Sequence, residues 1–106
     1  MKNITRSEAM KAVTSGATIY TRLLQESSGD IGFYRPRPTD SQEPHARDEV
    51  YVVASGTGTF VCAGQRTTFE PGDVLFVPRG VEHQFEDFDD EFATWVIFLG
   101  PSLAMQ

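Results

Sequence analysis

The sequence lacks several features that would assign it to common classes of protein. Among its 106 residues there is one cysteine, Cys62, so the chain forms no internal disulfide and shows no sign of an oxidising compartment. No apolar run approaches the ~20 residues that span a bilayer, and the polar start of the chain is unlike a signal peptide. We therefore expect no membrane partner and a cytoplasmic location.

Positive charge is also scarce in this chain. Nine Lys and Arg residues stand against 15 Asp and Glu residues, for a formal net charge of -6. A surface of this sign repels phosphate backbones, so nucleic acid is not an expected partner. With 40% hydrophobic and 11% aromatic residues the chain can build a core, and its length predicts one domain over residues 1–106.

Turn residues break the sequence into short β-prone runs after a helical start. Thr5 and Glu8 form a capping-box pattern, which predicts one short helix over about residues 6–14. From Gly16 onward, strand-like runs alternate with turn signals every ~6–12 residues, the pattern of an all-β sandwich or barrel with its core at about residues 17–99. The expected strands are 17–24, 31–35, 50–54, 59–63, 66–69, 74–77, 83–85 and 92–99.

Two of these runs, 74–77 and 95–99, are apolar on both faces. One face of each strand lines the barrel, so the other must meet a second sheet, the helix or a second subunit. We expect a homodimer, with a monomer whose outer face is covered as the alternative.

Histidine is also scarce, with two residues in the chain, and both stand in informative places. His45 precedes Glu49 by four residues, a separation of about 13 Å along a straight strand. If both bind one ion, residues 46–48 must form a bend. His83 follows the corner Pro78-Arg79-Gly80, and its strand parity aligns it with Phe85 among apolar neighbours. A lone histidine on an apolar face is more often a core residue, and only the motif spacings described below favour a metal site instead.

A fourth ligand is expected from the segment before His45. Glu43 shares its parity if the segment is extended, and Pro44 favours an extended Glu43. Gln42 has the other parity and enters the site only if the segment is irregular. If Glu43 does not bind the metal, it is the candidate general base.

The motifs resemble those of the cupin superfamily, in particular the small single-domain cupins. Residues 43–49, followed after six residues by Gly56, are similar to the later part of the first motif, G-x5-H-x-H-x3,4-E-x6-G. Residues 72–83 match the second motif, G-x5-P-x-G-x2-H-x3-N, at every fixed position up to His83. The sequence departs from the family where Glu43 replaces the first motif histidine and Asp87 the final asparagine.

The resemblance covers about residues 30–99 and implies a jelly-roll barrel, also called a double-stranded β-helix. It also implies a divalent transition metal (Fe, Mn, Ni, Co or Zn) held by His45, Glu49 and His83, with Glu43 as a further ligand. Two histidines and one carboxylate suit Fe(II) with open coordination positions.

Three functions remain open at this point. The first is a mononuclear metal-dependent enzyme, a dioxygenase-like oxidoreductase or an isomerase, acting on a small organic molecule. The second is a non-catalytic module that binds a small ligand, and the third is a barrel whose site has decayed. By inward parity and size, the residues expected to line the pocket are Phe33, Tyr51, Val53, Phe85 and Trp95.

Overall fold

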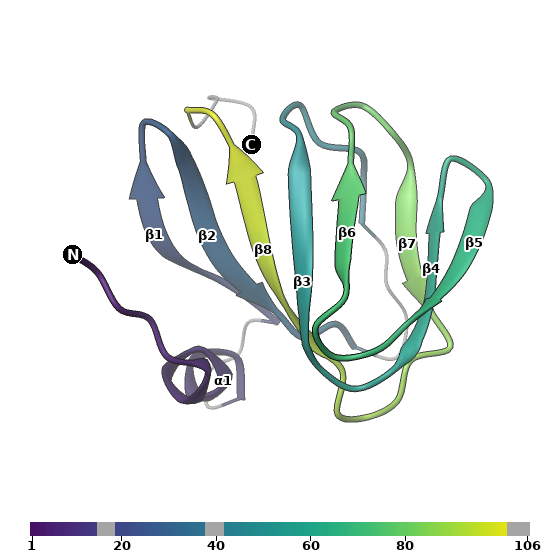
Figure 1. The fold of residues 1–106 in the computed structure, drawn as a ribbon, viewed down its shortest axis with the longest axis horizontal. Helices are drawn as coiled ribbons and strands as arrows, with labels where there is room; N and C mark the ends of the chain where they lie inside the picture. The colour runs from purple at the N-terminus through teal and green to yellow at the C-terminus, as the bar shows by residue number, and fades with distance from the viewer. Residues whose placement is uncertain (15–18, 38–41, 102–106) are drawn as a thin grey trace.

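The chain folds into two antiparallel β-sheets that face each other, with a helix near the N-terminus (Figure 1). The computed structural model describes residues 1–14, 19–37 and 42–101. Its elements are α1 (Arg6–Thr14), β1 (Tyr20–Glu26), β2 (Gly29–Tyr34), β3 (Glu49–Ser55), β4 (Gly58–Cys62), β5 (Gln65–Phe69), β6 (Val74–Val77), β7 (His83–Glu86) and β8 (Ala93–Leu99).

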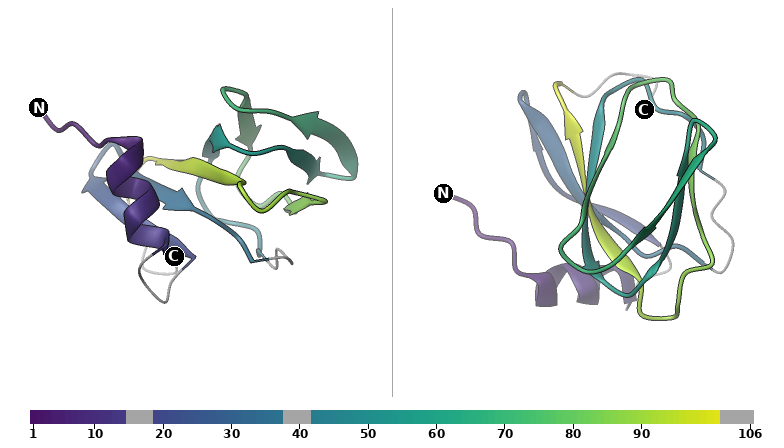
Figure 2. Two further views of the ribbon diagram at one scale, coloured as in Figure 1. Left: turned by 90° about the horizontal axis from the view of Figure 1, so that it is seen from below. Right: turned by 45° about the vertical axis from the view of Figure 1, so that its right-hand side comes forward.

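The order of the strands is that of a jelly roll. The larger sheet runs β1-β2-β8-β3-β6 and the smaller one β5-β4-β7. Strands distant in sequence, such as β3 and β8, pair side by side because the chain passes repeatedly between the two sheets. The two further views in Figure 2 show the sheets packed face to face. The predicted all-β class and double-stranded β-helix are therefore confirmed.

Helix α1 begins where the capping pattern predicted. The Thr5 hydroxyl accepts a hydrogen bond from the Glu8 backbone N–H at 3.1 Å, which satisfies one of the free donors of the first turn. Ala9 and Val13 form the buried face of the helix and pack against Phe33 and Ala93. The helix thereby covers part of the outer face of the larger sheet.

Aromatic side chains fill the space between the two sheets. Phe85 lies near the centre, with its ring centroid 4.8 Å from that of Tyr51, 4.8 Å from Phe60 and 4.7 Å from Phe92. Phe69 is 5.6 Å away. Such offset and edge-on ring pairs add to the free energy gained by burying the rings. This packed interior is a rigid base for the side chains that stand above it.

The first hairpin begins its second strand earlier than the sequence suggested. The prediction placed Ser27 to Asp30 in a turn, but only two residues separate β1 from β2, and Asp30 lies within β2. Gly29 adopts a φ of 154° and opens the strand. Asp30 then points inward and is only 1% exposed. The first two residues of the predicted strand 17–24, residues 17 and 18, lie outside the described residues.

The outer face of the larger sheet is covered at one end only. Beyond α1, Val74 and Phe76 on edge strand β6 are 64% and 54% exposed, and Leu99 on β8 is 45% exposed. Trp95 of β8, in contrast, packs in the cluster beneath α1. For this side chain the helix, one of the three covers considered from the sequence, covers the outer face of the strand. The homodimer stays a prediction, and these exposed side chains are the surface it would cover.

Candidate metal centre and pocket

Glu49 is the first residue of β3 and is placed by pairing on both sides. Its partners in register are Phe98 of β8 and Val77 of β6. Strand parity turns its side chain into the barrel, where the side chain is 2% exposed. A carboxylate buried to this degree is costly unless a cation or hydrogen-bond donors compensate it.

His45 reaches Glu49 because the chain bends between them. Ala46 and Arg47 form the predicted bend. His45 Nε2 lies 3.8 Å from Glu49 Oε1, a convergence that a straight strand would not allow. The His45 ring packs edge-on against Phe98 at 5.0 Å and remains 29% exposed. His45 therefore stands at the rim of the barrel.

The corner before β7 connects the two motifs directly. The Gly80 N–H donates to the His45 carbonyl at 2.7 Å, and the Arg79 N–H donates to Asp48 Oδ1 at 2.9 Å. Gly80 has a φ of 77°, a conformation that glycine adopts at least cost. These two hydrogen bonds hold the second motif beside the first although more than 30 residues separate them in sequence.

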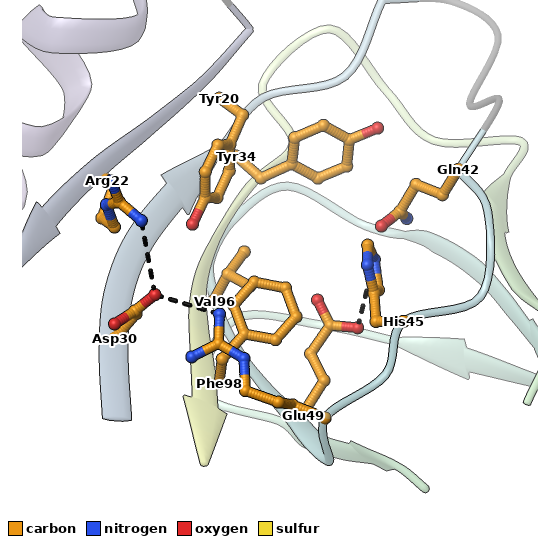
Figure 3. Close-up of a pocket in the computed structure, with 10 residues that line it drawn as sticks. Tyr20, Arg22, Asp30, Tyr34, Gln42, His45, Glu49, Val96 and Phe98 are labelled. Carbon is orange, nitrogen blue, oxygen red and sulfur yellow. Dashed lines mark hydrogen bonds and ion pairs between the residues drawn. The ribbon is translucent and has the colours of Figure 1, made fainter. Parts of the chain in front are cut away.

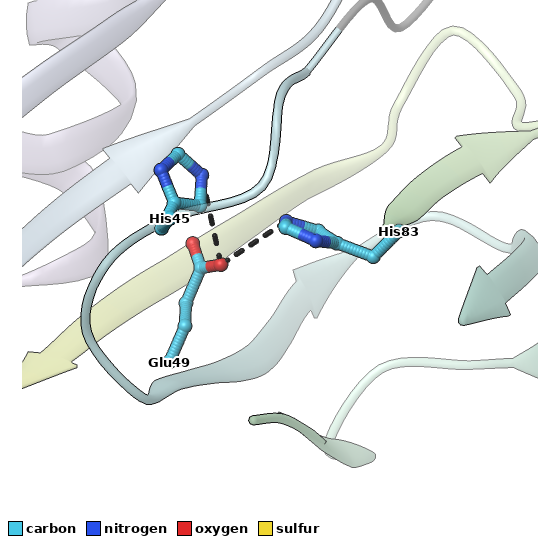
Figure 4. Close-up of side chains that lie close together, drawn as sticks. All are labelled: His45, Glu49 and His83. Atoms are coloured by element: carbon cyan, nitrogen blue, oxygen red, sulfur yellow. Dashed lines mark ion pairs between the residues drawn. The ribbon is translucent and has the colours of Figure 1, made fainter. Parts of the chain in front are cut away.

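His83 completes the group from the smaller sheet (Figure 4). Its Nδ1 lies 2.9 Å from the Val81 carbonyl, which can only accept, so the Nδ1 atom carries a proton. Its Nε2 lies 3.2 Å from Glu49 Oε1, and the imidazole side chain is fully buried. As predicted, His83 and Phe85 share the inward face of β7.

The three side chains fit a divalent cation. One ligand atom from each of His45, Glu49 and His83 lies within 4.8 Å of the other two. Metal bonds of 2.0–2.2 Å place neighbouring ligand atoms about 2.8–3.6 Å apart, close to the 3.2 Å and 3.8 Å found here. Glu49 Oε1 is buried and accepts no hydrogen bond from the described residues. In a neutral His83 the Nε2 lone pair would repel this oxygen, whereas a cation between the two atoms would be attracted by both.

The predicted fourth ligand, Glu43, is not part of this group. Residues 42–45 form no strand, so the alternation on which that prediction rested does not apply. Glu43 is exposed, whereas its neighbour Gln42 turns inward, and Gln42 Oε1 accepts a hydrogen bond from the Tyr51 hydroxyl at 2.8 Å. The irregular segment thus brings in the amide that parity had excluded.

A pocket of about 480 Å³ adjoins His45 and Glu49 (Figure 3). This size is in the range of small-molecule sites. Its walls are formed by Tyr20, Arg22, Asp30, Tyr34, Gln42, His45, Arg47, Glu49, Val96 and Phe98. The pocket therefore combines an apolar floor, the candidate metal ligands and a group of charged side chains.

None of the five side chains predicted to line the pocket does so. Phe33 and Trp95 point to the other face of the larger sheet and pack beneath α1. Their positions alternate with those of Gly32 and Val96, which face inward. Tyr51, Val53 and Phe85 do lie inside the barrel, but in the packed core below the pocket. Phe33 and Trp95 were predicted to line the pocket because they are larger than their neighbours Gly32 and Val96. The face of the sheet on which a side chain lies is set by its parity along the strand and not by its size.

The charged wall of the pocket was not anticipated from the sequence. Arg47 Nη2 and Arg22 Nη1 lie 3.0 Å and 3.7 Å from the same oxygen, Asp30 Oδ2. Asp30 had been assigned to a turn and Arg47 to the bend, so neither was considered inward-facing. The sequence did contain a signal that Asp30 faces inward. Asp30 is an acidic residue in an otherwise apolar strand, and it shares its parity with Gly32 and Tyr34.

Tyr20 lies across Gly32 and reaches into the pocket. A Cβ atom at Gly32 would clash with the Tyr20 hydroxyl, so glycine at this position leaves room for the phenol ring. Burial raises the pKa of Tyr20, and the negative charge of Asp30 adds to this effect. The hydroxyl therefore keeps its proton at neutral pH and can donate a hydrogen bond.

Comparison with known proteins agrees with the resemblance noted from the motifs. Residues 33–99, which include all three candidate ligands, match the family described as Cupin domain. The chain belongs to the cupin family. This cupin is also 38% identical over 96 residues to the "Uncharacterized protein SCO3923" of Streptomyces coelicolor, with 89% of this chain and 90% of that protein covered.

Two further similarities are more limited. This cupin is 37% identical over 65 residues to an acireductone dioxygenase of Geobacillus thermodenitrificans, which covers 55% of this chain but only 36% of that enzyme. Its fold matches a cupin-2 domain containing protein from Shewanella frigidimarina with a TM-score of 0.72, at 20% identity, covering 89% of this chain and 91% of the other. The second likeness concerns the fold alone.

Two other findings bear on the predictions. Within the described residues no helix has the length and apolar character that crossing a bilayer requires. Cys62 on β4 is a free thiol, and burial raises its pKa. It pairs in register with His83 on β7, but it is not among the three clustered candidate ligands.

Proposed function

We propose that this cupin binds one divalent transition metal ion through His45, Glu49 and His83, and that the ion holds a small organic molecule in the adjoining pocket. The observation that carries the proposal is the convergence of two imidazole nitrogens on a buried carboxylate oxygen. Iron, manganese, nickel, cobalt and zinc all accept this set of nitrogen and oxygen ligands.

The reaction we propose is a dioxygenase-like oxidation of the bound molecule. Two histidines and one carboxylate leave coordination positions open, and a bound Fe(II) would supply Lewis-acid and oxygen chemistry there. The partial likeness to acireductone dioxygenases supports this class of reaction over isomerisation. Because that likeness covers 36% of the enzyme, it supports the class of chemistry and not the substrate.

The residues around the three ligands have defined parts in this function. The Val81 carbonyl holds the Nδ1 proton of His83 and so directs Nε2 toward Glu49. The Tyr51 hydroxyl holds Gln42 at the pocket wall. Burial of Glu49 and His83 keeps water away from one side of the ion, which leaves the pocket side for the organic molecule.

Metal analysis tests the ligand set. Protein purified without chelators should contain close to one equivalent of transition metal by mass spectrometry, and Glu49→Gln or His83→Ala should lose it. Glu43→Gln is the matched control, because it removes an acid from the same segment but outside the cluster. Wild-type protein without metal, or equal loss in the Glu43 and Glu49 variants, would refute the proposal.

Oxygen consumption separates an enzyme from a binding module. The Fe(II)-loaded protein is offered a panel of small diketones, phenols and thiols at an oxygen electrode. Consumption that disappears in Glu49→Gln supports the dioxygenase. Isomerised product without oxygen uptake, or binding without any turnover, would contradict the proposed reaction and leave the metal site in place.

A further inference from the structure

The charged wall of the pocket carries more positive than negative charge. Both Arg22 and Arg47 approach one carboxylate oxygen of Asp30, at 3.7 Å and 3.0 Å. One carboxylate neutralises one guanidinium, so this group of three side chains has a net charge of about +1 at neutral pH. This local charge is opposite in sign to that of the whole chain, which is -6.

The environment of these side chains strengthens the effect. Asp30 and Arg47 are 1% and 7% exposed, and the Arg47 guanidinium carbon lies 4.7 Å from the centre of the Phe98 ring. Arg47 Nη1 also donates to the Gly100 carbonyl at 3.3 Å, which fixes the side chain. In a site of low polarity a fixed positive charge attracts an anion more strongly than it would in water.

Two adjustable donors stand beside this fixed charge. The Arg22 side chain is 47% exposed, and its contact with Asp30 is the longer of the two. The protonated Tyr20 hydroxyl lies over Gly32, the register partner of Arg22. Figure 3 shows Arg22 and Tyr20 on one side of the pocket and His45 with Glu49 on the other.

We propose that the pocket takes a small organic anion, with a carboxylate held by Arg22, Tyr20 and the charge of Arg47, and with oxygen atoms at its other end facing His45, Glu49 and His83. This inference rests on the proposed function, because the metal supplies the second binding end. A divalent ion beside the single charge of Glu49 makes that end positive as well.

Strand register limits the size of this anion. Asp30 and Glu49 are both register partners of Phe98, from the two strands that flank β8. Their Cα atoms are therefore two strand spacings apart, about 10 Å. The side chains at both ends take up part of this distance. A molecule whose carboxylate is separated by a few carbon atoms from the oxygen atoms at its other end spans the rest, and it fits a volume of about 480 Å³.

Binding of matched probes to metal-free Glu49→Gln protein tests the arginine end by itself, because this variant also removes the negative charge at the other end of the pocket. Succinate and its neutral analogue succinamide are titrated by NMR, which measures weak affinities. We expect succinate to bind at least tenfold more tightly, with shifts at residues around Arg22 and Tyr20, since hydrogen bonds to charged groups are worth about a factor of ten or more. Equal affinity for the two probes would overturn the inference.

Two arginine variants provide the control for charge. Arg22→Gln should lose most of the preference for succinate, and because the Arg22 side chain is 47% exposed, we expect the variant to fold. Arg66→Gln removes the same charge from the smaller sheet, where Arg66 pairs with Glu86 at 2.7 Å, and should keep the preference. Equal loss in both variants would show general attraction of anions and would overturn the site.

Asp30→Asn gives a prediction of opposite sign. Removing the counter-charge should tighten succinate binding several-fold, whereas a pocket built to recognise an ammonium or hydroxyl group through Asp30 would bind its ligand less well. Weaker succinate binding in a folded Asp30→Asn protein would therefore contradict the inference. Metal content is measured separately on the wild-type protein as purified, so that absence of metal counts against the proposed function and loss of succinate preference against the anion site.

Discussion

The corner at Gly80 offers a sharp test of how the candidate metal centre is assembled. Its N–H donates to the His45 carbonyl at 2.7 Å, so the corner positions a candidate ligand that belongs to the other motif. Gly80→Ala forces an L side chain into a φ of 77°. We expect the corner to relax away from this conformation and to release the segment that carries His45.

The expected cost follows from the surroundings of Gly80. No atom lies within 4 Å of the position that its Cβ would take, so the methyl group itself meets no obstacle. What remains is backbone strain of about 1–2 kcal/mol for a left-handed L residue. For a domain of this size, each kcal/mol lowers the melting temperature by about 4–8 °C. Loss of a group that orients a ligand lowers metal affinity by about 10- to 100-fold.

Gly72→Ala is the matched control at the opposite end of β3. Gly72 has a φ of 93°, no atom within 4 Å of its Cβ position, and an N–H that donates to the Val53 carbonyl at 2.8 Å. Thermal unfolding of metal-free protein should show similar losses for both variants. Competition with a chelator should show weaker metal binding for Gly80→Ala alone. If both variants or neither bind metal more weakly, the corner does not position His45 as argued.

Three other predictions concern the core, the pocket and the outer face. Phe85→Ala should lower the free energy of unfolding, measured by urea unfolding, by about 3–5 kcal/mol because it empties the centre of the aromatic cluster. Because the pKa of Tyr20 is raised in the folded state, the stability that its protonated form contributes is complete below pH 10 and is lost above it. Tyr20→Phe should flatten this loss of stability at alkaline pH. An unchanged loss would contradict the raised pKa of Tyr20. If the chain forms a homodimer through its outer face, light scattering should give twice the chain mass, and Phe76→Asp should halve it.

The elements of this fold could be predicted because their signals are local. A threonine cap marked the start of α1, and glycine and proline marked the ends of the strands. The bend between His45 and Glu49 followed from a distance argument, since a straight strand would keep the two side chains too far apart to bind one ion. The inward direction of His83 followed from its parity with Phe85.

The pocket could not be predicted in the same way because it depends on which strands become neighbours. Asp30 meets Arg47 through the pairing of β2 with β8 and of β8 with β3, which no local pattern specifies. Gln42 enters the pocket from a segment without regular structure, where alternation gives no guidance. A charged pair separated by 17 residues in sequence has no signature in a single chain.

The unequal burial of the three candidate ligands determines the route of an ion. Glu49 and His83 project from strands on opposing sheets, and their side chains are sealed inside the barrel. His45 precedes β3 in a segment without regular structure, and about a third of its side chain is open to solvent. An ion held by this group would therefore enter and leave on the side of His45, where solvent reaches the cluster.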